Sequence, residues 1–526
     1  MSILHVIPLK RLPFGKTFFE YACPKEHEAL VRVGSFVELP WRKGRIWGVV
    51  WRIHQESTYS GTVKSVTAVA SYFYVPEDIL VVIMELHPLW ATSPSTALLL
   101  VVPQLPKKIA TFIRIYEDAQ PIVVNSVTPH SFSVPSSWSS ILTRSLRSVV
   151  ASSIPLYIQS YSPRFRRALL LAQVKYAYDR KKTYILVCPS LRHLHDLLPY
   201  LVEVVPMEHI IFNPTSLSEY ASVLKKQAEG TPLLVLGLRS VVWAPVRADM
   251  YCVDDEDDPE FKEERHPHYT SSQVACARAR ASGGHALIMG SMRTLSTSYA
   301  IRNGTMRYDA PLLPLRDSVS TTYVSLRDER VGGNMSYISG ELERVMNDAL
   351  SKGESVVLYH NRKGWGKRYV CVTCHADSYE PSSDICPFCK TKGLRAKSVG
   401  TARLDAWVKN RFSSVPILRI EGGTHDMKIA IPKGSIIIAT QSLFSFPPLS
   451  FHEFGSSIGV VAIIALENNF SAVDYTKNEA QALLVSRMQS WATGVGAKEY
   501  IVQHWGDTTY NEEEEIQWRI KLGLPL

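Results

Sequence analysis

The stretch Cys371-Val372-Thr373-Cys374 is followed, eleven residues later, by Cys386-Pro387-Phe388-Cys389, which gives the spacing C-x2-C-x11-C-x2-C. Each C-x-x-C turn can point two thiolates at one ion, and two such turns complete a tetrahedral four-sulfur site of the kind that suits zinc. The intervening residues are polar and cannot form a core of their own. We therefore predict one structural zinc ion without an open coordination position, held by Cys371, Cys374, Cys386 and Cys389.

Two plainer interpretations of these cysteines stay open, namely four unrelated reduced thiols and two disulfides. The other cysteines (Cys23, Cys188, Cys252 and Cys276) are scattered through apolar or mixed surroundings. That placement is typical of buried free thiols in a reducing compartment.

Composition sets broad limits on the protein. The chain has 526 residues, 46% of them hydrophobic, and a formal net charge of +9. This length allows roughly three or four domains. The basic excess favours nucleic acid or another polyanion as a partner, although many soluble proteins are equally basic. The N-terminus lacks the apolar run of a signal peptide, and the apolar stretches at 79–84 and 97–102 are too short to span a bilayer. We expect a cytoplasmic protein without a membrane partner.

Residues 1–105 are predicted to form a β-rich domain. The segments 31–40 and 46–51 read as strands, joined by a turn that contains Lys43, Gly44 and Arg45. Basic and aromatic residues interleave around this turn, as in surfaces that stack bases and contact phosphates. An ordinary hairpin with a solvated basic turn is the alternative. Residues 106–150 are rich in Ser, Thr, Pro and Val, and we expect a linker there.

From residue 151 onward helical and strand patterns alternate, which predicts an α/β fold. Buried strands are expected at 183–188, 232–236, 250–253 and 286–289 in a first parallel-sheet lobe (151–335). A second α/β lobe (336–526) carries the cysteine module at about 366–396. Ligands of such sheets bind at the carboxyl ends of the strands, and the acidic run 254–258 follows one of the predicted strands.

The order of these signals resembles the PriA-type primosomal helicases (primosomal protein N′), superfamily 2 proteins of replication restart. The resemblance implies two RecA-like lobes, a zinc insertion and an N-terminal DNA-binding domain. The segments that carry it are Phe19–Tyr21, Gly237–Ser240, Val253–Asp257, Gly290–Met292, Asn361–Trp365, Cys386–Cys389, Val399–Thr401, Ala439–Gln441 and Asp474–Glu479.

The resemblance also implies a pocket for a DNA 3′ end. Phe19 and Tyr21 would form its walls, with plain core packing as the alternative. Glu20 stands in place of the aspartate that hydrogen-bonds the terminal sugar hydroxyl, and Lys64 would contact a phosphate. The loop Phe261–Tyr269 occupies the place of an aromatic-rich loop that couples DNA to ATP in the family, and a flexible charged loop is the plainer interpretation.

The chain departs from the family where ATP should bind. The segment Ser160–Arg167 contains no glycine, although a phosphate loop needs glycines so that backbone N–H groups can converge on the phosphates. Pro163 has no N–H, and Arg166 stands where a lysine would reach the phosphates. For Arg164, Arg166 and Arg167 two interpretations stay open, a solvated helix start and a DNA-phosphate contact.

Two further parts of the ATPase are altered. Asp254 could still hold Mg²⁺, but Asp255 is one methylene shorter than the family's glutamate, and displacements of about 1 Å can cost about 100-fold in rate. The place of the family's final arginine motif reads Ser490–Gly496, without arginine. We therefore expect ATP hydrolysis to be absent or very weak. Asp254 and Asp255 would be the remnant of a catalytic site, and we do not count Mg²⁺ and ATP as firm cofactors.

Other family features are reduced as well. The family carries eight cysteines and two ions in its zinc region, and four cysteines remain here, which implies one zinc. The winged-helix module has no convincing counterpart in 106–150, and the sequence stops near where the family's C-terminal domain would begin.

Three functions are compatible with this sequence. The favoured hypothesis is a DNA-binding replication-restart scaffold that recognises branched DNA (forks, single strands or 3′ ends) without unwinding it and docks on primosome or single-strand-binding proteins. The second is an active ATP-dependent 3′→5′ DNA helicase, against which the missing phosphate loop argues. The third is a protein-interaction scaffold without DNA binding, against which the basic charge and the β domain argue.

Overall fold

The computed structural model describes residues 2–102, 105–106, 109–119, 127–212, 214, 216–263, 265–313, 318–360, 368–374, 377–379, 385–386, 388–396, 401–421, 430–469, 476–506 and 510–522. The chain divides into two compact units. Unit 1 comprises 1–158, 166–290 and 300–311, and unit 2 comprises 159–165, 291–299 and 312–526.

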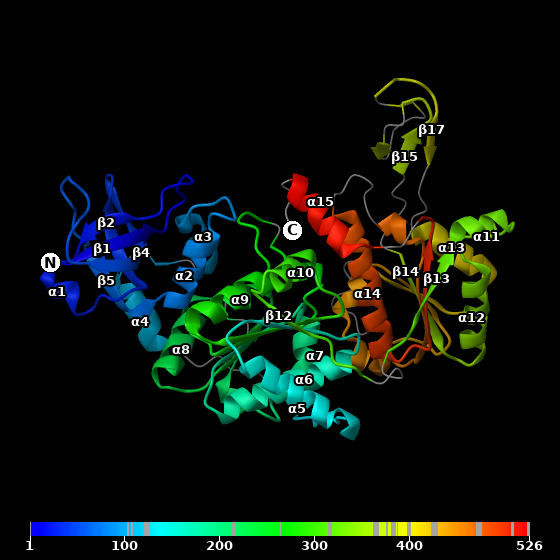
Figure 1. Ribbon diagram of the computed structural model, residues 1–526, viewed down its shortest axis with the longest axis horizontal. Coiled ribbons are helices and arrows are strands. Elements are labelled where there is room, and N and C mark those ends of the chain that lie inside the picture. Colours follow the sequence, from blue (N-terminus) through cyan, green and yellow to red (C-terminus); the bar gives the residue numbers. More distant parts are fainter. Residues whose placement is uncertain are drawn as a thin grey trace. The chain divides into compact units, whose positions relative to one another are not determined.

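Unit 1 begins with a five-stranded antiparallel sheet in the order β2-β1-β4-β3-β5 (Figure 1, blue). Its strands are β1 (Ile3–Pro8), β2 (Phe19–Ala22), β3 (Ser35–Trp41), β4 (Gly44–His54) and β5 (Ala68–Tyr74). The predicted hairpin is β3–β4, and the β-rich domain is confirmed. Both faces of the sheet are buried: Phe36 and Val49 belong to one apolar cluster, and Val37 and Val50 belong to another.

Short helices surround this sheet and continue into the segment that we expected to be a linker. They are α1 (Lys25–Glu28), α2 (Glu77–Leu86), α3 (Pro94–Val101), α4 (Ile109–Asp118) and α5 (Ser139–Val150). The segment 106–150 thus contains two helices. α4 packs on β5 through the stacked rings of Tyr72 and Tyr116, 4.9 Å apart, and α5 buries Val149. The Ser- and Pro-rich composition of this segment favours a linker, although both helices have an amphipathic apolar spacing.

The second part of unit 1 is a seven-stranded sheet in the order β12-β6-β11-β10-β7-β9-β8. The strand pairs described are parallel. The strands are β6 (Leu156–Gln159), β7 (Tyr184–Val187), β8 (Ile210–Phe212), β9 (Leu234–Gly237), β10 (Met250–Val253), β11 (His285–Gly290) and β12 (Arg307–Asp309). β7, β9 and β10 are buried at every position, as the continuous apolar runs predicted. The accompanying helices are α6 (Pro163–Asp179), α7 (Leu191–Leu201), α8 (Leu217–Ala228), α9 (Ser271–Ser282) and α10 (Leu295–Arg302).

A buried ion pair ties the N-terminal sheet's helix α2 to α9 of the parallel lobe. Arg278 Nε donates to Asp78 Oδ2 at 2.7 Å, and both side chains are almost fully buried. The remaining guanidinium N–H groups donate to the carbonyls of Val242, Ala244 and Val246 at 2.7, 3.1 and 2.6 Å. Each charge is thus buried with an opposite charge beside it, although Asp78 Oδ1 has no hydrogen-bond partner among the described residues.

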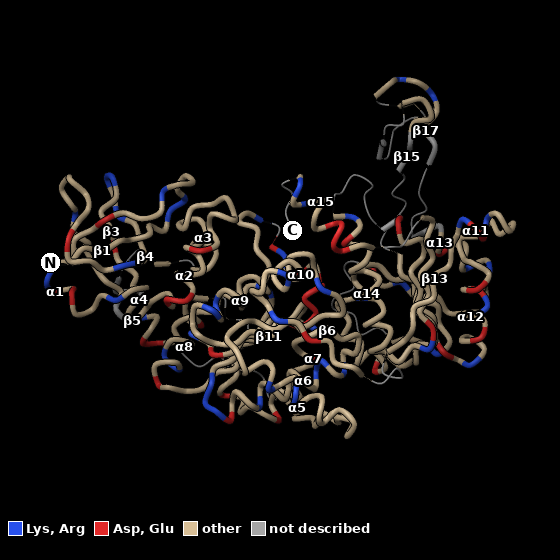
Figure 2. The backbone as a smooth tube through the Cα atoms, viewed as in Figure 1, with Lys and Arg blue, Asp and Glu red and all other residues tan. Residues whose placement is uncertain are grey.

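Unit 2 is built on a six-stranded sheet in the order β13-β21-β20-β14-β19-β18, with parallel pairs. Its strands are β13 (Thr321–Ser325), β14 (Ser355–Tyr359), β18 (Ile417–Ile420), β19 (Ile436–Ala439), β20 (Ile458–Ile463) and β21 (Glu499–His504). Its helices are α11 (Leu326–Val331), α12 (Gly340–Ser351), α13 (Thr401–Arg411), α14 (Lys477–Val495) and α15 (Glu512–Leu522). The charged residues of α12 are Glu341, Glu343, Arg344 and Asp348 (Figure 2).

The cysteine segment forms a separate three-stranded antiparallel sheet in the order β16-β15-β17. It consists of β15 (Arg368–Cys371), β16 (Asp377–Tyr379) and β17 (Leu394–Ala396). The predicted fold class, two RecA-like parallel-sheet lobes with a cysteine-bearing insertion and an N-terminal β-rich domain, is confirmed. Among the described helices, none is both long and apolar enough to cross a lipid bilayer.

Candidate nucleic-acid, nucleotide and metal sites

β2 positions the three residues predicted to line a 3′-end pocket. Its register with β1 pairs Phe19 with Val6, Glu20 with His5 and Tyr21 with Leu4. Because successive side chains of a strand point to opposite faces, Phe19 and Tyr21 lie on one face and Glu20 lies on the other. Tyr21 is buried in the small apolar cluster, and Phe19 packs against that cluster. The strand thus turns the two aromatic side chains toward the core, while the carboxylate of Glu20 takes the opposite face.

The Glu20 carboxylate lies under the loop that follows β4. It accepts hydrogen bonds from the hydroxyls of Ser57 and Thr58, and from the backbone N–H groups of Thr58 at 3.1 Å and Tyr59 at 3.3 Å. His5 Nε2 lies 3.5 Å from Oε1. The hydroxyl donors, first Ser57 and then Thr58, lower the pKa of Glu20 to about 2. The side chain is therefore an ionised acceptor whose hydrogen-bonding positions are taken by this loop.

His5, the neighbour of Glu20 on β1, is itself packed against two other rings. The His5 ring stacks on Phe18 with 4.2 Å between centroids, and His54 lies at the same centroid distance from His5. Burial, followed by the nearby His54, lowers the pKa of His5. Sequence reasoning missed these neighbours, although strand alternation from Glu20 to its partner on β1 would have indicated His5 once the pairing was known.

Lys64 is exposed next to the same edge of the sheet. Its backbone carbonyl accepts a hydrogen bond from Ala22 N–H at 2.9 Å, one residue after Tyr21. All four predicted DNA-binding residues (Phe19, Glu20, Tyr21 and Lys64) therefore come together around β2, and their role in DNA binding stays a prediction.

The acidic run 254–258, called the acidic box below, begins at the carboxyl end of β10. Its first two residues, Asp254 and Asp255, are paired with Arg166 of α6. Arg166 Nε donates to Asp254 Oδ1 at 2.8 Å, and a terminal nitrogen of the same guanidinium donates to Asp255. The Arg166 side chain is only 1% exposed, whereas the two carboxylates retain 23% and 24% exposure. Asp255 adopts a left-handed backbone with φ of 59°, and its N–H donates to Asp254 Oδ1 at 3.0 Å.

Electrostatics at this site favour a fixed ion pair. Burial raises the pKa of Asp254 to about 6 against the attraction of Arg166, and the neighbouring Asp255 charge adds to the rise. Burial works against the charged form of Arg166, but the charges of Asp255, Asp254 and Asp257 outweigh it and raise the pKa of the guanidinium. The cation therefore remains charged between the two carboxylates.

The start of α6 has no phosphate-loop character. Ser162 Oγ accepts a hydrogen bond from Phe165 N–H at 3.2 Å, so a side chain caps a helix donor that a phosphate loop would offer to a ligand. The Phe165 side chain is fully buried.

Arg166 and Arg167 do not form a solvated helix start. Arg167 is paired with Asp196, and its guanidinium carbon lies 5.3 Å from the centroid of the Tyr200 ring. A solvated helix start is therefore wrong for these two residues, because both are largely buried and paired with carboxylates of unit 1, and a DNA-phosphate contact stays a prediction. Arg164 is exposed.

The segment Ser490–Gly496, which replaces the arginine motif, is the C-terminal end of α14. Trp491 is buried there, and its indole N–H donates to the carbonyl of Phe446 at 3.2 Å. Earlier in the same helix Arg487 lies over the Phe444 ring, 3.8 Å from its centroid. The helix end thus contributes to the core of unit 2.

The loop after the acidic box is tied down at several points. Phe261 and Tyr269 are buried, and Tyr269 meets the Trp243 ring edge-on at 5.6 Å. Arg239 donates to the carbonyls of Glu260 and Lys262 at 2.9 and 2.8 Å. Both aromatic ends of the loop are therefore used in packing.

The four predicted zinc ligands converge. Their sulfur atoms all lie within 4.8 Å of one another, with Cys371 and Cys389 at 3.5 Å and Cys374 and Cys386 at 3.6 Å. A tetrahedral zinc–thiolate site, with Zn–S of about 2.3 Å, places its sulfurs about 3.8 Å apart. None of these cysteines is in a disulfide. Both plainer interpretations, scattered thiols and disulfides, are thus wrong.

Local hydrogen bonds favour the thiolate form that a zinc ligand requires. The backbone N–H of Cys374, followed by that of Thr373, lowers the pKa of the Cys371 thiol to about 5, with Thr373 N–H 3.4 Å from its sulfur. The donor set fits a zinc ion, which the cysteine sulfurs of both turns would hold together. Three segments named for the family resemblance (361–365, 399–400 and 474–475) lie outside the described residues.

Comparison with known proteins finds similarity to replication restart proteins. The family of the PriA 3′DNA-binding domain (3′BD) matches residues 6–103. The chain is 23% identical over 303 residues to replication restart protein PriA of Bacillus subtilis, and this match covers 49% of this chain and 36% of that protein. It is 24% identical over 374 residues to PriA of Thermotoga maritima, and this match covers 64% of this chain and 49% of that protein.

The match thus spans about a third to a half of the length of these curated relatives. Among solved structures, RecG bound to a three-way DNA junction is 10% identical with a TM-score of 0.39, and the match covers 85% of this chain and 50% of that one. The chain is therefore similar to PriA-type replication restart proteins, and its residues 6–103 match the family of the PriA 3′DNA-binding domain.

Proposed function

We propose that this chain is a replication-restart protein that binds branched DNA at its 3′ end and no longer couples ATP hydrolysis to strand separation. The observation that carries this proposal is the buried ion pair of Arg166 with Asp254 and Asp255. In this arrangement a side chain of the protein itself neutralises the carboxylates that would otherwise hold a metal ion.

An arginine at position 166 binds the two carboxylates differently from the lysine of a phosphate loop. A lysine presents a compact point charge that can turn toward a phosphate, whereas the planar guanidinium of Arg166 presents several donors in a fixed fork. One arm of the fork reaches Asp254 and another reaches Asp255. Binding of Mg²⁺ to these carboxylates would require the guanidinium to leave a position that is 1% exposed, which would leave a charge buried without a partner.

DNA binding is supported by the N-terminal domain. A 3′-terminal sugar hydroxyl is a hydrogen-bond donor, and Glu20 is an ionised acceptor beside the stacked rings of His5 and Phe18. We propose that the 3′ end replaces part of the hydrogen bonding that Ser57 and Thr58 supply to Glu20, with Lys64 near a phosphate. The zinc module would dock primosome or single-strand-binding proteins in the cytoplasm.

The ATPase part of the proposal is tested by steady-state phosphate release. Full-length protein is incubated with ATP, Mg²⁺ and forked DNA, alongside Asp254→Ala as the matched control. We expect no DNA-stimulated release above that of the control. Release that depends on both DNA and Asp254 would refute the proposal and favour an active helicase.

The DNA-binding part is tested by fluorescence anisotropy on a fork with a nascent 3′ end. Glu20→Ala is expected to reduce the preference for a free 3′-hydroxyl over a 3′-phosphate, because the phosphate cannot donate to the carboxylate. Glu56→Ala, an exposed change in the same loop region, serves as control and should leave the ratio unchanged. An unaltered ratio in Glu20→Ala removes Glu20 from the site, and no binding near physiological salt favours a scaffold without DNA contacts.

A further inference from the structure

Helix α5 lies within a stretch of the chain that carries no carboxylate side chain. No Asp or Glu occurs from Ala119 through Tyr178, although the chain has 49 of them among 526 residues, so a stretch of this length would ordinarily carry several. Arg144 and Arg147 both belong to α5, whose first turn also lacks acidic residues (Figure 2). The surface of α5 is therefore free of the negative charge that would repel a polyanion.

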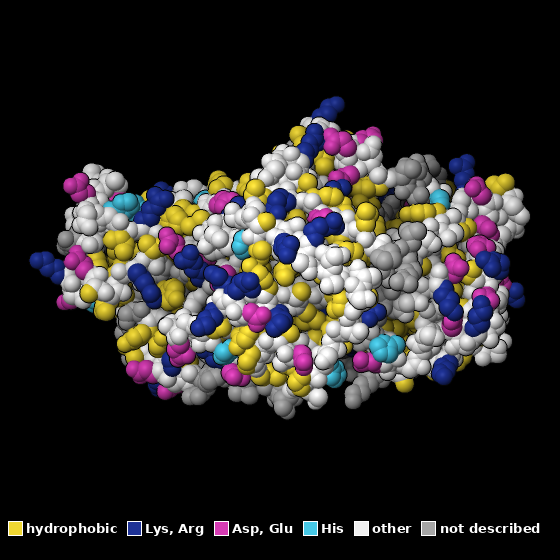
Figure 3. All heavy atoms as spheres, turned by 60° about the horizontal axis from the view of Figure 1, so that its bottom comes forward, with side chains coloured by type: hydrophobic (Ala, Val, Ile, Leu, Met, Phe, Trp, Pro, Cys, Tyr) yellow, Lys and Arg dark blue, Asp and Glu magenta, His cyan; other side chains and the backbone are white. Residues whose placement is uncertain are grey.

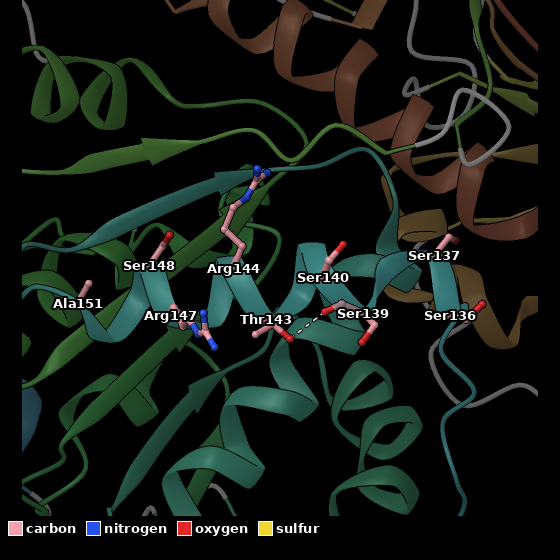
Figure 4. Close-up of a pocket in the computed structure, with 9 residues that line it drawn as sticks. All are labelled: Ser136, Ser137, Ser139, Ser140, Thr143, Arg144, Arg147, Ser148 and Ala151. Atoms are coloured by element: carbon pink, nitrogen blue, oxygen red, sulfur yellow. Dashed lines mark hydrogen bonds between the residues drawn. The ribbon is translucent and has the colours of Figure 1, made fainter.

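Hydroxyl and guanidinium groups line a shallow hollow of about 810 Å³ along α5 (Figure 4). We call the surface of this hollow the α5 face. Its lining residues are Ser136, Ser137, Ser139, Ser140, Thr143, Arg144, Arg147, Ser148 and Ala151. Apart from Ala151, each offers O–H or N–H donors, and the lining contains no carboxylate.

The two arginines of the α5 face are available for a ligand. Both are exposed, and neither has a hydrogen bond or ion pair among the residues that the structure describes. The arginines at the start of α6 differ, since Arg166 and Arg167 are each bound to aspartate. On the α5 face itself, the Thr143 hydroxyl donates to the Ser139 carbonyl at 2.9 Å, which satisfies that group internally.

A second hollow extends the α5 face toward β12. It shares Arg144 and Ser148 with the first and adds Leu156, Arg307, Tyr308 and Asp309. Arg307 donates to the carbonyl of Ile154 at 3.2 Å and therefore has a structural role, and Asp309 is the carboxylate at this far edge. The Tyr308 ring is 41% exposed. The donor-rich region thus centres on α5, with one aromatic side chain beside it.

A merely solvated face would have a different composition. Serine is a poorer helix former than Glu, Lys or Gln, and those residues would keep a helix soluble at lower cost. The combination of Ser, Thr and Arg without carboxylates is instead the donor set that proteins direct at phosphate oxygens. On the side of the molecule that Figure 3 brings forward, Lys and Arg side chains are interspersed with Asp and Glu.

We infer that the α5 face binds the phosphate backbone of DNA as a contact separate from the 3′-end site. This inference rests on the proposed DNA-binding function and adds a second point of attachment to it. Because phosphates carry no sequence information, the contact would hold any strand that the N-terminal domain has engaged.

The experiment uses full-length protein and a circular single-stranded oligonucleotide, which has no 3′ end. Each phosphate contact on a single strand contributes about 0.7 to the slope of log affinity against log salt. The double variant R144Q/R147Q should therefore lower the slope by about 1.4 and weaken binding roughly 10-fold near 0.15 M salt. The matched control is K175Q/K181Q, which removes the same charge from exposed lysines that line neither hollow.

The outcomes separate the two proposals. A reduced slope in R144Q/R147Q but not in K175Q/K181Q supports the α5 face, and equal slopes in both variants overturn it. If the wild type prefers a 3′-hydroxyl on linear DNA yet R144Q/R147Q binds the circle normally, the proposed function stands and the α5 face fails. If polyglutamate of matched charge displaces the circle as well as DNA does, the face is a general polyanion surface and the inference is wrong.

Discussion

Replacement of Arg166 by methionine tests whether the nucleotide site is closed by an internal ion pair. Methionine keeps most of the side-chain volume and removes the charge. Asp254 and Asp255 would then face each other without a cation, at 23% and 24% exposure. Breaking a buried pair by removing one partner costs about 3–5 kcal/mol, and the partial exposure of the carboxylates points to the lower end. For a unit of this size, that corresponds to a fall in Tm on the order of 10 °C.

The loss should depend on pH in a defined direction. The folded-state pKa of Asp254, about 6, already lies above its ordinary value, so the folded state binds this proton more tightly than the unfolded chain does. The stability that protonation of Asp254 contributes to the folded state is fully present below pH 4 and is lost as the pH rises through 6. Arg166 lowers that pKa, so its removal raises it further. The deficit of Arg166→Met should therefore be small at pH 5 and largest at pH 8.

The measurement is calorimetric or fluorimetric thermal unfolding at pH 5, 6.5 and 8. Arg280→Met is the control, because its pair with Glu85 is exposed and is worth less than about 1 kcal/mol. Adding Asp254→Asn and Asp255→Asn to Arg166→Met should restore stability, since the site then contains no unpaired charge. A variant as stable as the wild type, or a deficit independent of pH, would contradict a closed site.

Metal analysis of purified protein should find one zinc per chain that is lost in Cys386→Ser, and two ions or none would contradict the four-sulfur site. Arg278→Met should destabilise unit 1 by about 3–5 kcal/mol, because Asp78 would be left buried and unpaired, and a fall in Tm no larger than that of an exposed pair would exclude this role. Thr58→Ala removes a donor to Glu20, so NMR titration should show the Glu20 pKa rising from about 2 toward its ordinary value, and an unchanged pKa would mean that the loop does not hold the carboxylate.

Periodicity in the sequence was sufficient for the architecture. Continuous apolar runs predicted β7, β9, β10 and β11, because strands of a parallel sheet are covered on both faces and need apolar side chains at nearly every position. Cysteine spacing predicted the metal site, because a C-x-x-C turn fixes two sulfurs locally. The helices of 106–150 escaped prediction because the Ser- and Pro-rich composition of this segment favours a linker, even though both helices have an amphipathic apolar spacing.

The sequence by itself determined that the phosphate loop is absent, because missing glycines and a proline forbid converging N–H donors whatever the rest of the chain does. Only the tertiary structure decided what became of the site. Arg166 and Asp254 are 88 residues apart in the chain, and no local pattern indicates that a guanidinium at the start of α6 lies between two carboxylates at the end of β10. Likewise, the pairing of β1 with β2 decided that His5 lies opposite Glu20. Both are consequences of contacts between distant segments, which a linear sequence does not encode locally.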